Sequence, residues 1–204
     1  MEYSKETNNK DVFISIFDLW AKRTPAYETH FEKEVIKPLT DFSLGTNEAS
    51  EAKGKILGAG YEALIMAFFI GLYSNKRIPL SEYADIKDLG QPIQYWGNIE
   101  NRKGRRAYPK LKYYIFLSLV AKSPDIEWVE LDKGKWTPKE TVNSLMITME
   151  EYINYGLSYM FDKIKENEGY FYRDDSFLDV FKELTQDKSS LENNDDPNEP
   201  ESLD

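Results

Sequence analysis

The chain has 204 residues, no cysteine and a formal net charge of -10, with 41% apolar and 14% aromatic residues. A chain of this length and apolar content can bury a core of its own, so we expect one folded domain. The missing thiols exclude disulfides, thiolate zinc sites and a cysteine nucleophile, and the excess of acids opposes general coating of nucleic acid, because phosphate is repelled.

The first ten residues are polar and mixed in charge, which predicts a flexible N-terminus without an apolar secretory segment. A cytoplasmic location is therefore the expectation. Residues 11–186 predict one helical domain. Its first helix is expected where apolar residues recur at helical spacing, namely Val12, Phe13, Ile16, Phe17 and Trp20.

A second helix is expected over residues 24–38, with Thr24 as its cap, Pro25 in its first turn and Pro38 at its end. The run from 56 to 73 is then almost entirely apolar, broken only by Glu62. It could span a membrane or form the central helix of the domain. We favour a central helix over 56–74, because a carboxylate in hydrocarbon costs about 2 kcal/mol or more.

The next segment predicts a connector with a short helix after Ser81, followed by a polar loop and a buried helix that begins at Pro109. Residues 123–136 are ambiguous. They could form a short helix that Gly134 ends, or a small β-hairpin near 126–136.

The clearest helix start is Thr-Pro-Lys-Glu at 137–140, because Thr137 and Glu140 have the capping-box spacing. This helix is expected to run to about Asn167. A shorter helix follows after a cap among residues 174–176. Residues 187–204 have seven acids and one lysine and predict a disordered acidic tail. The fold class is thus mainly α, a single-domain bundle of about six or seven helices with an optional small hairpin.

Catalytic and metal chemistry find little support in the residue pattern. His30 is the sole histidine and, with Glu34, provides too few ligands for a metal. The sequence GAGYEA at 58–63 lacks the phosphate-loop ending, so we interpret Gly58 and Ala59 as a close helix contact. Glu62 could be an acid or base, but a structural partner such as a tyrosine hydroxyl is the favoured interpretation. No cofactor is expected.

Positive charge is concentrated in one segment, residues 96–114, which has six basic residues and one acid. Guanidinium groups bind phosphates, and aromatic rings stack on unpaired bases, so this composition is typical of contact with single strands or ends of nucleic acid. The candidate nucleic-acid-binding residues are Trp96, Asn98, Asn101, Arg102, Lys103, Arg105, Arg106, Tyr108, Lys110 and Lys112.

The sequence leaves the role of this segment open. The cations could pair with acids of the same chain, or contact an acidic partner protein. The acidic tail could also screen them until a stronger polyanion displaces it. Our leading hypothesis is a non-enzymatic accessory subunit that contacts nucleic acid. A protein-binding adaptor or assembly subunit is second, and a small enzyme using Glu62 is third. The abundance of Lys, Asn, Ile and Tyr resembles bacterial chains of low-GC coding.

Overall fold

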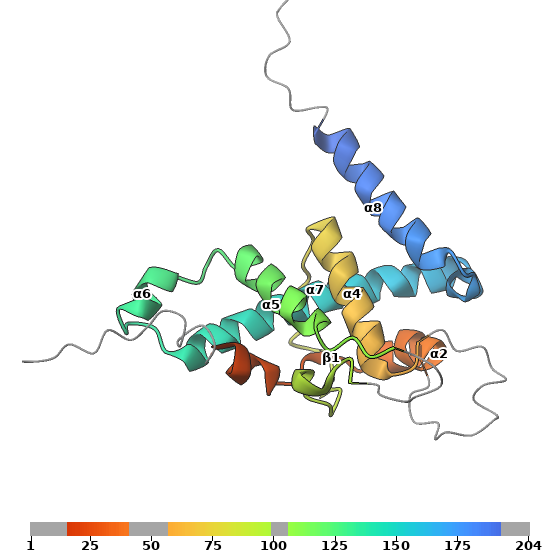
Figure 1. The fold of residues 1–204 in the computed structure, drawn as a ribbon. Coiled ribbons are helices and arrows are strands. Elements are labelled where there is room, and N and C mark those ends of the chain that lie inside the picture. Colours follow the sequence, from red (N-terminus) through yellow and green to blue (C-terminus); the bar gives the residue numbers. More distant parts are fainter. Residues whose placement is uncertain (1–15, 41–56, 99–105, 193–204) are drawn as a thin grey trace, which may run out of the picture.

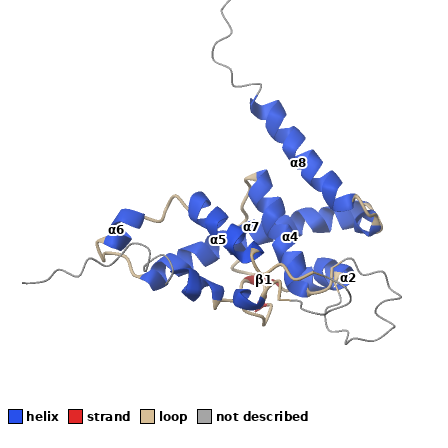
Figure 2. Cartoon of the chain, in the orientation of Figure 1, coloured by secondary structure: helices blue, strands red, loops and turns tan. Residues whose placement is uncertain are grey.

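The structure of the protein, a computed structural model, describes residues 16–40, 57–98 and 106–192. It is mainly helical, as predicted, and its only strands within those ranges form one small antiparallel pair (Figure 2). Two long helices occupy the centre: α4 (Gly60–Ser74) and α7 (Pro138–Glu166). Figure 1 shows the other helices arranged around these two.

Helix α4 is the predicted central helix, although it begins four residues later than 56. Leu64, Ala67, Phe68 and Ile70 are fully buried, so its apolar sequence is explained by packing inside the protein. Among the described residues, no helix combines the length and the apolar content needed to cross a membrane.

Helices α4 and α7 cross closely through two glycines. A side chain at Gly156 would collide with the backbone carbonyl of Ala67, and one at Gly71 would collide with that of Tyr152. The glycine contact expected at Gly58 therefore lies elsewhere. Gly58 precedes α4, and its amide donates to Glu62 Oε2 in the first turn of the helix at 2.7 Å.

Helix α7 confirms the capping-box prediction. Glu140 N donates to Thr137 Oγ1 at 3.2 Å, and Thr137 N donates to Glu140 Oε2 at 2.8 Å. The helix ends one residue before its C-cap Asn167, close to the expected boundary. The hydrogen-bonding partners named by the sequence pattern are thus the ones observed.

The helix predicted over 24–38 is wrong in its first half. Residues 26–28 form strand β1 (Ala26–Glu28), which pairs antiparallel with β2 (Ile86–Asp88) in the register Tyr27↔Lys87. Ala26 N donates to Glu150 Oε1 on α7 at 2.9 Å, and the Tyr27 side chain is fully buried. These contacts with distant residues override the local helical signal.

Helical structure follows β1 and reaches slightly beyond the predicted end. The π-helical segment η1 (Glu32–Ile36) leads directly into α2 (Lys37–Leu39), which contains Pro38 in its first turn. The short helix expected after Ser81 is absent from the described structure, because that segment forms a turn and then β2. The first predicted helix is observed over residues 16–21, whereas Val12 and Phe13 lie outside the described residues.

The remaining helices match their predicted positions. Helix α5 (Leu111–Lys122) follows Pro109, and the ambiguous segment 123–136 contains a helix, α6 (Trp128–Asp132), instead of a hairpin. Short 3-10 segments occur at η2 (Ile93–Tyr95) and η3 (Tyr170–Tyr172). Helix α8 (Ser176–Glu192) extends away from the body (Figure 1) and continues past residue 187, where the acidic tail was expected to begin.

Candidate functional site

Tyr108 N donates to Gly97 O at 3.0 Å, so the described residues on either side of 99–105 lie side by side. Gly97 has a φ of 77°, and a Cβ added there would lie 2.7 Å from the Tyr108 carbonyl oxygen. Glycine is therefore required where the chain at position 97 meets Tyr108.

Trp96 is part of the core. Its side chain is 2% exposed, its ring stacks on Tyr61 at 5.7 Å between centroids, and its Nε1 donates to Gln91 O at 3.1 Å. The ring therefore presents no surface on which a base could stack, contrary to the expectation from the sequence.

Tyr108 is likewise occupied within the protein. Its hydroxyl donates to Glu62 Oε1 at 2.5 Å, and burial, followed by this carboxylate, raises the tyrosine pKa well above its usual range. Since Gly58 N binds the other oxygen, both oxygens of Glu62 have partners. The prediction of a structural tyrosine partner for Glu62 is confirmed, and the first turn of α4 holds both ends of the loop.

The cations of the segment differ in their surroundings. Lys112 Nζ donates to Gln94 O at 2.8 Å, so this amine helps to attach α5 to η2. Arg106 and Lys110 are exposed, as is Asn98, and within the described ranges neither cation forms an ion pair. Four further candidates lie outside the described residues, namely Asn101, Arg102, Lys103 and Arg105. We call Arg106 and Lys110 the cation pair.

Exposed side chains continue from the cation pair along α5. Lys110, Tyr114, Leu117 and Ala121 follow one another at steps of four, three and four residues, which places them on one face of the helix. Tyr114 is 63% and Leu117 is 53% exposed. We call these four residues the α5 stripe. Beside it, the ring of Tyr113 stacks on Phe17 at 4.6 Å, so one face of that ring is covered.

The far end of the α5 stripe reaches a hollow of about 320 Å³. Its lining residues come from the ends of α4 and α5, the chain after each, and the middle of α7: Asn75, Arg77, Ala121, Lys122, Pro124 and Tyr152. Lys122 Nζ donates to Asn75 Oδ1 at 3.0 Å, and Arg77 lies 3.6 Å from the Glu151 carboxylate. The sequence pattern did not single out this hollow, because its residues are far apart in the chain.

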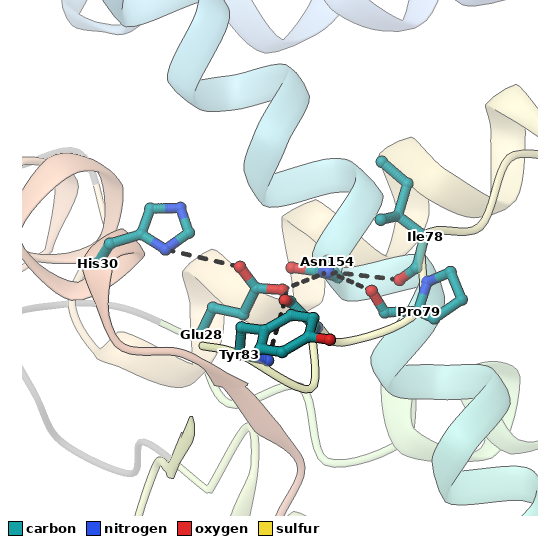
Figure 3. Close-up of polar contacts among 7 residues, drawn as sticks. Glu28, His30, Ile78, Pro79, Tyr83 and Asn154 are labelled. Atoms are coloured by element: carbon teal, nitrogen blue, oxygen red, sulfur yellow. Dashed lines mark hydrogen bonds and ion pairs between the residues drawn. The ribbon is translucent and has the colours of Figure 1, made fainter. Parts of the chain in front are cut away.

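A polar cluster lies where β1 meets α7 (Figure 3). Buried Asn154 donates through Nδ2 to Glu28 Oε1 at 3.1 Å and to Pro79 O at 3.1 Å, and Ser81 N also donates to Glu28 Oε1 at 2.9 Å. His30 Nδ1 lies 3.6 Å from Glu28 Oε2. In the part of the chain that the structure describes, no group of three His, Asp or Glu residues could hold a metal ion. The contacts fix the connector between α4 and β2 in place.

Comparisons with protein-family models, with curated proteins and with solved structures find no match to this chain.

Proposed function

We propose that the protein is a non-enzymatic accessory subunit that contacts single-stranded nucleic acid where α5 begins. The observation that carries this proposal is the cation pair, since Arg106 and Lys110 are exposed and lack ion-pair partners among the described residues. Both are free to meet phosphates, which supply most of the affinity in such complexes.

The aromatic part of the contact differs from the sequence-based hypothesis. Trp96 and Tyr108 are occupied by contacts within the protein, whereas Tyr114, one turn after Lys110, is exposed. An exposed tyrosine beside cations can stack on a base of any sequence, so the contact needs no base-specific hydrogen bonds. The net charge of -10 confines attraction to this local surface, because charges beyond about 8 Å are screened at physiological salt.

A salt titration tests the proposal. Binding of fluorescein-labelled oligo-dT is measured by anisotropy for the R106A/K110A double variant and for K33A, which removes an exposed charge from η1, away from α5 (Figure 1). The double variant should bind more weakly and lose about 1.4 from its salt slope, at about 0.7 per phosphate contact. If it binds as K33A does, the proposal is wrong. A variant that carries R102A and R105A in addition to R106A/K110A tests whether Arg102 and Arg105 also bind nucleic acid, as the sequence predicts.

A second candidate is a protein-binding adaptor, because Leu117 and Leu19 are exposed on neighbouring helices and large apolar side chains are favoured at protein interfaces. This function predicts association that resists nuclease and salt. The variant L19K, at an exposed residue outside the α5 stripe, would abolish such association and would leave oligo-dT binding intact.

A further inference from the structure

The cation pair and the hollow lie at opposite ends of α5, and the α5 stripe connects them. Lys110 begins the stripe, and Ala121 belongs both to the stripe and to the lining of the hollow. The helix between them is about 18 Å long at 1.5 Å per residue. A ligand that follows the stripe from the cation pair therefore arrives at the hollow.

The hollow has the chemistry of an anion site. Lys122 and Arg77 line it, and Lys76 precedes Arg77 in the chain. The one acid in contact with these lining cations in the described structure is Glu151, which lies 3.6 Å from Arg77, a long and partly exposed pair. Such a pair contributes little and leaves the guanidinium available to a phosphate.

The end of α4 beside the hollow opposes an anion only weakly. Helix α4 stops at Ser74, and Asn75, in the left-handed conformation, returns its amide to the carbonyls of Gly71 and Leu72. Those carbonyls are therefore satisfied, and the remaining field of a helix end at a surface is weak and screened by salt. The Asn75 side chain accepts from Lys122 and holds that amine at the edge of the hollow.

We infer that one strand of nucleic acid runs along the α5 stripe from the cation pair and places a phosphate in the hollow, between Lys122 and Arg77. This inference rests on the proposed function and adds a second contact to it. Bases would lie over Tyr114 and Leu117, while the two cationic ends hold the backbone.

An oligo-dT ladder of about 4 to 16 nucleotides separates the two contacts. For K122A, binding of the longest oligonucleotides should weaken and the salt slope should fall by about 0.7, while the shortest ones should bind as they do to the unchanged protein. For R106A/K110A, binding should weaken at every length. The variant K33A is the matched charge control.

The outcomes distinguish the two proposals. If K122A and K33A behave alike at all lengths while R106A/K110A is weakened, the path to the hollow is wrong and the proposed function stands. If K122A, K33A and R106A/K110A all behave alike, the path to the hollow and the proposed function are both wrong. A K122R variant guards against a local structural effect: it keeps the charge and should bind long oligonucleotides normally, whereas K122Q should behave like K122A. Equal weakening by K122R and K122Q would also overturn the inference.

Discussion

The Tyr108 hydroxyl donates a 2.5 Å hydrogen bond to Glu62 Oε1 across 46 residues of sequence. It joins the end of the basic loop to the first turn of the central helix, while Tyr61 on the same turn stacks on Trp96 at the beginning of the loop. Trp96 and Tyr108 therefore attach the two ends of the basic segment to the first turn of α4.

Replacing Tyr108 by Phe should destabilise the protein by about 1–3 kcal/mol, because Glu62, only 6% exposed, would lose one hydrogen-bond partner inside the protein. Urea denaturation measures this change. The matched control is Y83F, since Tyr83 is 98% exposed and its loss of a hydroxyl should change the free energy of unfolding very little. Equal effects of the two substitutions would contradict the role assigned to the Tyr108 hydroxyl.

Replacing Gly156 by Ala should cost about 2 kcal/mol or more, because the added methyl group meets the Ala67 backbone, which cannot rotate away. The control is G169A. Its Cβ would meet only the Asn167 side-chain oxygen at 3.3 Å, so a small change is expected. Thermal unfolding of both variants checks the prediction, and a near-neutral G156A would refute the close crossing of α4 and α7.

Replacing Asn154 by Asp should be strongly destabilising at neutral pH. All three groups that accept from Asn154 Nδ2 are oxygens, namely Glu28 Oε1, Pro79 O and Ile78 O, so a carboxylate there would be repelled. Repulsion and burial would raise the pKa of the introduced acid, so the loss should be largest above its raised pKa and should shrink as pH falls through it.

The control for N154D lies on the same helix. Asn143 Oδ1 accepts from Arg23 at 2.8 Å on the surface, so N143D should be neutral or slightly stabilising. Stability is compared by urea denaturation at several pH values. Parallel pH profiles for the two variants would argue against the donor role of Asn154.

Acid should weaken the protein partly through Glu32. Ion pairs with Lys37 at 2.8 Å and Lys87 at 2.7 Å lower the pKa of Glu32 from 4.5 to about 2. Because the pKa of Glu32 is lower in the folded protein than in the unfolded chain, its carboxylate stabilises the fold at pH values above the unfolded pKa. This contribution is lost as pH falls from about 4.5 through 2. Because both lysines are half-exposed, solvent screening limits it to about 1 kcal/mol.

The variant E32Q should therefore be less stable than the unchanged protein at pH 7, with a difference that shrinks toward pH 2 and in high salt. The exposed neighbour Glu34, which has no ion pair among the described residues, supplies the control E34Q. A difference for E32Q that is constant with pH would show that the ion pairs contribute nothing.

Local signals in the sequence predicted the helices that depend on local chemistry. Thr137 and Glu140 lie three residues apart and cap α7 through contacts between themselves, and the apolar run of α4, interrupted by one carboxylate, favoured the buried helix that is observed. Strand β1 could not be predicted in this way, because its partner β2 and its hydrogen bond from Ala26 to Glu150 come from distant parts of the chain.

The candidate site shows the same division. The cations of the basic segment are evident in the sequence, and Arg106 and Lys110 are exposed as a ligand would require. Whether a ring in that segment faces solvent is decided by tertiary packing, which turns Trp96 inward against Tyr61 and leaves Tyr114 outside. The hollow at the far end of α5 depends on Arg77 and Lys122 meeting in space, and no spacing along the chain encodes that meeting.

The crossing at Gly71 and Gly156 also has a consequence for redesign. Because α4 and α7 approach each other through main-chain atoms at Gly71 and Gly156, the backbone itself sets their separation at the crossing. Protein engineers can therefore treat this helix pair as a fixed frame and vary the outer residues of α5 in combinatorial libraries, with little risk that the backbone geometry will follow the changes.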